Sequence, residues 1–194
     1  MPQISRDSLM TLEAYAKARN DFRTKVLAHK KPRTVHLGDH VTLLFEDELT
    51  IRYQVQEMLR IEKTFDEAGI QDELDVYNPL VPDGSNLKAT MLIEYEDAEE
   101  RKRALATLRN VERHVYLRVE GSPRVYAIAD EDLERGTAEK TAAVHFLRFE
   151  LSGDMIAALK RGAALDAGVD HPEYTVADTV LSADTRESLI GDLN

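Results

Sequence analysis

Glu62 is a carboxylate in a position where its neighbours are expected to be apolar. An expected helix over residues 49–65 places Glu62 within about 20° of the centre of an arc of apolar side chains. Burying an unpaired charge costs several kcal/mol, so an inward-facing carboxylate needs a cationic partner. The expected first helix, over residues 6–30, carries Arg19 and Arg23 within its own apolar stripe. We therefore predict that Glu62 meets one of these guanidinium groups across a helix–helix contact.

Two histidines show the same anomaly on expected strands. Alternation over residues 142–151 places His145 on a face with leucine and phenylalanine side chains, and alternation over residues 163–171 continues an apolar face to His171. A histidine in such a place is more often a hydrogen-bonded core residue than a ligand. The predicted buried polar cluster comprises Arg19, Arg23, Glu62, His145 and His171.

The same cluster contains a candidate ligand set for a metal ion, formed by Glu62, His145 and His171. Two imidazoles and one carboxylate suit iron, manganese or zinc, and Glu57 or Glu46 would supply a further carboxylate. Cysteine is absent, which excludes thiolate zinc sites, Cys-bound iron–sulfur clusters and cysteine nucleophiles. This set supports the hypothesis of a metal-dependent enzyme or sensor, which requires the ligand atoms to lie about 2.0–2.2 Å from one point.

Three arginines allow a further hypothesis, that the protein binds a small anion. It predicts a pocket lined by Arg19, Arg23 and Arg33 with no carboxylate opposite, and it fails where a carboxylate neutralises them. The sequence contains no glycine-rich phosphate loop, no G-x-S-x-G turn and no H-E-x-x-H helix. Whether the chain is an enzyme therefore stays open.

Composition and charge limit the partners. The 194 residues are 43% hydrophobic and 31% charged, which is typical of one packed domain. Residues 1–33 carry a net charge of +5 and the rest of the chain −16, so an acidic body argues against nucleic acid as a ligand. The basic segment is expected to pack on this acidic body or to dock an acidic partner. With no apolar segment long enough for a signal peptide or a bilayer span, we expect a cytoplasmic protein.

The expected elements indicate a single α+β domain over residues 1–194, mainly helical over 1–86 and containing a mixed or antiparallel sheet over 87–194. Residues 87–151 follow the order β-α-β-β-(short α)-β, which suits a ferredoxin-like core with its second helix near 131–135. The expected elements are a long N-terminal helix over 6–30, capped by Ser5 or Asp7, a hairpin over 33–45, helices over 49–65 and 70–77, a strand over 87–95, an Asp97-capped helix to about 110, strands over 115–120 and 124–129, a strand over 142–151, a Ser152-capped helix over 153–161, a strand over 163–171 and a helix over 184–190.

Five segments carry a family resemblance, namely residues 45–46, 54–62, 77–84, 144–149 and 170–172. Along nearly the whole chain the sequence resembles an uncharacterised bacterial family, the domain of unknown function 3501. The resemblance implies an accessory role in iron or peroxide redox handling, with rubrerythrin-like or iron–sulfur redox proteins as partners. It implies no activity and no site residue.

The leading hypothesis is therefore a non-catalytic accessory or interaction protein that works beside a redox system. In this hypothesis the buried arginine, glutamate and histidine side chains stabilise the fold. The metal-dependent enzyme or sensor and the small-anion binder remain its alternatives.

Overall fold

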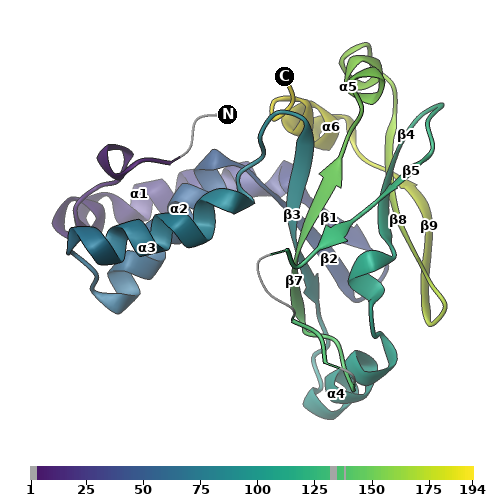
Figure 1. Cartoon of the computed structure of the whole chain (residues 1–194), viewed down its shortest axis with the longest axis horizontal. Helices are drawn as coiled ribbons and strands as arrows, with labels where there is room; N and C mark the ends of the chain where they lie inside the picture. The colour runs from purple at the N-terminus through teal and green to yellow at the C-terminus, as the bar shows by residue number, and fades with distance from the viewer. Residues whose placement is uncertain (1–3, 132–134, 138) are drawn as a thin grey trace.

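Three helices of the N-terminal half form an arm that projects from the strands (Figure 1). In this computed structural model, which describes residues 4–131, 135–137 and 139–194, the arm consists of α1 (Leu12–Lys30), α2 (Glu48–Glu62) and α3 (Glu67–Tyr77). Its own apolar cluster includes Leu9, Ile51, Val55, Leu59, Ile70 and Leu74. The long N-terminal helix of the predicted fold is thus confirmed, although most of its surface faces solvent.

Side-chain caps determine where the helices of the arm begin. Thr11 accepts a hydrogen bond from the amide of Ala14, so α1 begins at Leu12. The predicted caps Ser5 and Asp7 are wrong, because residues 6–8 form a separate 3-10 turn and the Ser5 side chain makes no capping bond. Asp47 and Thr50 form a reciprocal capping box that starts α2.

The strands form two antiparallel sheets. The five-stranded sheet has the order β1-β2-β3-β7-β6 and the four-stranded sheet has the order β5-β4-β8-β9. The bounds are β1 (Thr34–Leu37), β2 (Val41–Glu46), β3 (Asn86–Ile93), β4 (Val115–Val119), β5 (Arg124–Tyr126), β6 (Ile128–Ala129), β7 (Val144–Glu150), β8 (Leu165–His171) and β9 (Tyr174–Val180). The α+β class predicted from the sequence is confirmed.

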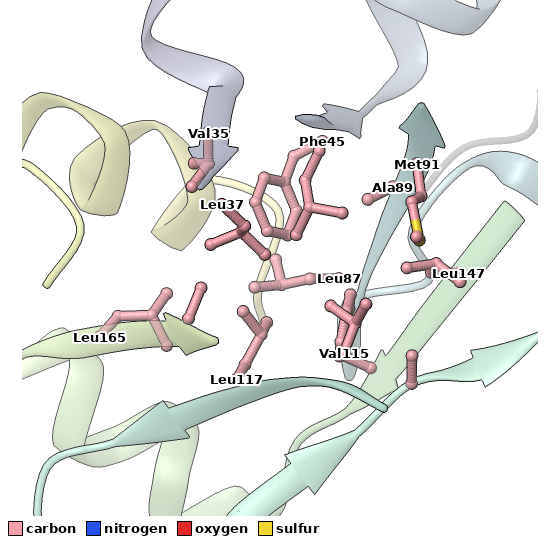
Figure 2. Close-up of a cluster of buried hydrophobic side chains, with 14 of the residues drawn as sticks. Val35, Leu37, Phe45, Leu87, Ala89, Met91, Val115, Leu117, Leu147 and Leu165 are labelled. Atoms are coloured by element: carbon pink, nitrogen blue, oxygen red, sulfur yellow. The ribbon is translucent and has the colours of Figure 1, made fainter. Parts of the chain in front are cut away.

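The two sheets face each other across the main apolar core (Figure 2). Phe45 and Leu87 of the five-stranded sheet point toward Leu117 and Leu165 of the four-stranded sheet, and all four side chains are buried. Three helices complete this part of the fold: α4 (Ala98–Thr107), α5 (Gly153–Lys160) and α6 (Ala183–Ile190). Figure 1 shows α5 and α6 near one end of the strands and α4 near the other.

The ferredoxin-like topology is wrong. That topology requires the strands of residues 87–151 to share one sheet, whereas β3 pairs with β2 and β7, and β4 pairs with β5 and β8. The physical reason is that β4 pairs with β8, a strand far away in the sequence, and not with β3 or β7. The edge strand β9, which was not predicted, extends this second sheet. The expected helix near 131–135 falls mainly on residues 132–134, which lie outside the described residues.

No described helix has both the length and the apolar composition that a membrane crossing requires.

Candidate functional site

Arg19 is paired with Glu57 and not with Glu62. Its Nε and Nη2 atoms donate to the two carboxylate oxygens of Glu57 over 2.8 and 2.9 Å, and the buried Tyr15 hydroxyl donates to the same carboxylate over 2.6 Å. This bidentate bond from Arg19 is the main reason that the pKa of Glu57 falls to about 2. The predicted ion pair of Glu62 is therefore wrong, although Arg19 does pair with a carboxylate of α2.

Glu62 is exposed, so its predicted burial is wrong. The buried positions of α2 stop at Leu59, and the last turn extends past the residues that cover the helix. Ile61 and Phe65, which belonged to the same expected arc, are 59% and 78% exposed. A helical projection gives the angle of a side chain but not where its covering neighbours end. Arg23 is exposed as well, and no ion pair joins it to a carboxylate within the described part of the chain.

Substituting Glu57 tests the contact between α1 and α2. Because its pKa is lowered in the folded chain, the carboxylate stabilises the fold at pH values above about 4.5, and this contribution is lost as the pH falls toward about 2. We expect Glu57→Gln to lower the free energy of unfolding by about 2 kcal/mol at pH 7, and the difference from wild type to shrink below pH 4. Urea unfolding at pH 7 and pH 3 measures both values. Glu13→Gln, at an exposed pair with Lys17, is the control; a Glu57 difference that is independent of pH would contradict the assignment.

Arg33 is completely buried, and carboxylates surround it. Its guanidinium donates to the backbone oxygens of Phe45 and Glu46 over 2.9 and 3.1 Å, and it pairs with Asp192. Burial raises the pKa of Asp192 to about 6 despite this pairing. Asp47 lies 3.5 Å from the same guanidinium. The anion-binding hypothesis required no carboxylate opposite Arg19 and Arg33, so its predicted pocket is wrong.

His171 is a satisfied core histidine. Its Nε2 donates to the backbone oxygen of Arg109 over 3.0 Å, and its Nδ1 accepts from the amide of Glu173 over 3.2 Å. Both ring nitrogens are therefore engaged by the backbone. His171 makes no described contact with His145 or Glu62, so the structure does not bring the predicted ligand set together.

His145 lies in a separate buried cluster. As predicted, it is on the inward face of its strand, and its side chain is completely buried. Nδ1 lies 2.6 Å from Oδ2 of Asp130, and Nε2 lies 2.8 Å from Oγ1 of Thr141. Thr141 donates in turn to Oε2 of Glu112 over 3.1 Å, and that oxygen is 3.7 Å from His145 Nε2. The cluster is thus a chain of contacts from Asp130 through His145 and Thr141 to Glu112.

Oxygen atoms lie within hydrogen-bond distance of both ring nitrogens of His145. Nδ1 faces a carboxylate, and Nε2 also lies 3.1 Å from the backbone oxygen of Ala142, which can only accept. Each carboxylate of the cluster thus has a polar partner, Asp130 in the ring and Glu112 in the Thr141 hydroxyl.

Turns at the end of the five-stranded sheet position the two carboxylates. Asp130 follows β6 with a φ of 54°, a left-handed conformation that is uncommon for residues other than glycine, and its Oδ1 accepts from the amide of Phe146 over 3.2 Å. Glu112 lies in a 3-10 turn and is buried. The Thr141 amide is held by the backbone oxygen of Leu105 over 2.9 Å.

A pocket of about 650 Å³ adjoins this cluster. Glu112, Asp130 and Thr141 reach its wall, and the remaining lining residues are Arg109, Asn110, Arg113, Gly136, Thr137 and Lys140. Solvent or a ligand therefore has a route to the carboxylates. The sequence reading identified His145 but missed Glu112, Asp130 and Thr141, because all three lie in irregular segments where periodicity gives no signal.

Comparison with known proteins places the whole chain in one family. The family model described as "Protein of unknown function (DUF3501)" matches residues 3–193. A crystal structure of a protein of unknown function from Burkholderia pseudomallei K96243 has a TM-score of 0.96 and 61% sequence identity, with 100% of each chain covered. No curated protein matches the chain.

Proposed function

The chain belongs to the DUF3501 family, as its sequence motifs indicated, and we propose that it binds one divalent transition-metal ion through Glu112, Asp130 and His145. One observation carries the proposal: an oxygen or nitrogen from each of these side chains lies within 4.8 Å of the others. Histidine and carboxylate ligands suit iron, manganese and zinc. Iron or manganese would agree with the redox role that the family resemblance implies.

The geometry of the three side chains is close to that of a metal site. Bonds of about 2.0–2.2 Å leave any two ligand atoms no more than about 4.4 Å apart. The distance between His145 Nε2 and Glu112 Oε2, 3.7 Å, already meets this condition. Asp130 contacts the other ring nitrogen, Nδ1, over 2.6 Å, so one ion held by all three side chains would require the ring or a carboxylate to turn. Three protein ligands would leave coordination positions open toward the pocket.

Binding would change the protonation of His145. A coordinating ring nitrogen must release its proton, so binding competes with the hydrogen bonds that Nε2 or Nδ1 now donates. We therefore expect binding to release a proton. Calorimetric titrations in two buffers of different ionisation enthalpy would measure the proton released.

The direct test is metal binding by protein purified without an affinity tag and then treated with a chelator. We expect the wild-type chain to bind about one Fe²⁺, Mn²⁺, Zn²⁺ or Co²⁺ ion, and Glu112→Gln or Asp130→Asn to weaken binding by about 100-fold or more. Calorimetry gives the stoichiometry and the affinity. Circular dichroism checks that each variant remains folded.

Glu46→Gln is the matched control, because Glu46 is a buried carboxylate that bonds Thr50 and Thr90 away from the pocket. Its substitution should leave the metal affinity unchanged. Absence of binding by the wild-type chain to all four ions would exclude the proposal. An equal loss of affinity in all three variants would also count against it.

The accessory role is a second candidate, and one observation favours it. Among the exposed large apolar side chains of the helical arm and the turn after α2, Ile61, Phe65 and Val76 are 59%, 78% and 64% exposed. Such residues are frequent where a protein docks a partner. The family resemblance supplies the partner class, a rubrerythrin-like or iron–sulfur redox protein.

A binding experiment with purified components tests this second candidate. A purified rubrerythrin-like protein should bind the wild-type chain and bind the double variant Ile61→Ser/Phe65→Ser at least 10-fold more weakly, since buried apolar anchors carry most of the energy of an interface. Leu27→Ser, at another exposed apolar position of the arm, is the control. Equal affinity of the wild-type chain, the double variant and the Leu27→Ser variant would contradict a docking role for Ile61 and Phe65.

A further inference from the structure

The wall of the pocket beside His145 carries basic side chains in a protein that is otherwise strongly acidic. Arg113 and Lys140 line the pocket together with Glu112 and Asp130. Both basic residues are exposed, and within the described residues neither side chain forms an ion pair. The chain as a whole has a net charge of −11.

The charges around this pocket would not balance if a metal ion were bound, because negative charge would be lacking. Asp130 already pairs with Arg135, whose Nε lies 3.4 Å from its Oδ1. A divalent metal ion bound at the proposed site would supply the further positive charge for Glu112 and Asp130, and His145 would be neutral as a ligand. The positive charges of Arg113 and Lys140 would then remain without a counter-charge. Guanidinium and ammonium groups at the mouth of a pocket are the usual recognition groups for carboxylates and phosphates.

We infer that this pocket takes a small oxyanion, a carboxylate or a phosphate, that occupies an open coordination position of the metal and contacts Arg113 and Lys140. The inference rests on the proposed metal site and names the ligand class of that site. A pocket of about 650 Å³ has room for a molecule of metabolite size beside the ion. Thr137 and Asn110 add neutral hydrogen-bonding groups to the same wall.

Cobalt-loaded protein gives a test that separates this inference from the proposed function. Co²⁺ bound at the site should produce a visible absorption spectrum, and adding inorganic phosphate or malonate should change that spectrum in a saturable way. The oxyanion that binds more tightly identifies the preferred class. A cobalt spectrum that neither anion alters would overturn the inference while the metal site stands, and failure of cobalt to bind would remove both.

The variant Arg113→Ala/Lys140→Ala tests the role of the basic wall. We expect it to bind cobalt like wild type and to bind the preferred anion about 10-fold or more weakly, because two charge-assisted contacts are removed. The matched control is Lys102→Ala/Arg103→Ala, which removes the same charges from exposed positions of α4 outside the pocket. Equal weakening of anion binding in both double variants would show a general charge effect and overturn the inference.

Discussion

Replacing Arg33 by methionine is expected to lower the free energy of unfolding by about 3–5 kcal/mol, because removing one partner of a buried ion pair leaves an uncompensated charge. The Arg33 side chain is 1% exposed. It holds the end of β2, through Phe45 and Glu46, against Ser188 and Asp192 of the C-terminal segment. Methionine fills similar space but satisfies none of these acceptors. Chemical denaturation at pH 7 measures the loss.

Arg23→Met is the matched control for this substitution. Arg23 is exposed on α1, and its replacement should change the stability by no more than about 0.5 kcal/mol. Adding Asp192→Asn to Arg33→Met should recover part of the loss, because it removes one of the carboxylates left unpaired. A loss of less than about 1 kcal/mol in Arg33→Met would contradict the assigned role.

The Arg33 cluster shows what the sequence could and could not predict. The sequence analysis named Arg33 as a lining residue of a candidate anion pocket, and no local pattern connects residue 33 with residue 192. The pairing of Arg19 with Glu57 was missed for a related reason. The angular projection placed Glu62 at the centre of the buried arc, whereas Arg19 of α1 pairs with Glu57 and Glu62 is exposed.

Local features of the fold were predicted well. Asp97 and Ser152 cap α4 and α5 as expected, since capping depends on residues three positions apart. The local pairing of the hairpin over 33–45 was predicted, and β1 pairs with β2 as expected. The long-range pairing of β3 with β7 and of β4 with β8 was not predicted, because a strand's own residues do not specify a distant partner. The edge strand β9 did carry a usable signal in its β-branched residues Thr175, Val176 and Thr179.

The candidate site, too, was predicted only where its residues lie in a regular element. His145 was identified because a histidine breaks the apolar alternation of a regular strand. Glu112 and Asp130 lie in turns, where a carboxylate is ordinary, so only the tertiary structure could show that they converge on the ring. When a site combines one strand residue with residues from turns, periodicity identifies the strand residue and misses the others.

The four-stranded sheet contains a tight contact between Tyr116 and Gly168, which face each other on β4 and β8. The Tyr116 ring lies over this glycine, and its hydroxyl donates to Asp178 over 2.6 Å. A Cβ atom on Gly168 would lie 2.3 Å from the Tyr116 hydroxyl oxygen and 2.8 Å from the backbone oxygen of Val176. The pairing of β8 with β9 is irregular at this position, between Ala167 and Val169. Any side chain here must displace a buried aromatic ring or the β9 backbone.

Gly168→Ala is therefore expected to lower the free energy of unfolding by about 3 kcal/mol, at the upper end of the usual cost of overpacking. Gly153→Ala is the control, since nothing lies within 4 Å of its added Cβ, and it should change the stability by less than about 1 kcal/mol. In a Tyr116→Ala background the added cost of Gly168→Ala should fall by about 1 kcal/mol or more, because the ring is gone, but part of it should remain, because the backbone oxygen of Val176 still lies 2.8 Å from the added Cβ. A double-mutant cycle by urea denaturation measures this coupling. If Gly168→Ala lowers the stability no more than Gly153→Ala does, the packing of Tyr116 does not require a glycine at position 168. The contact would then not constrain the pairing of β4 with β8.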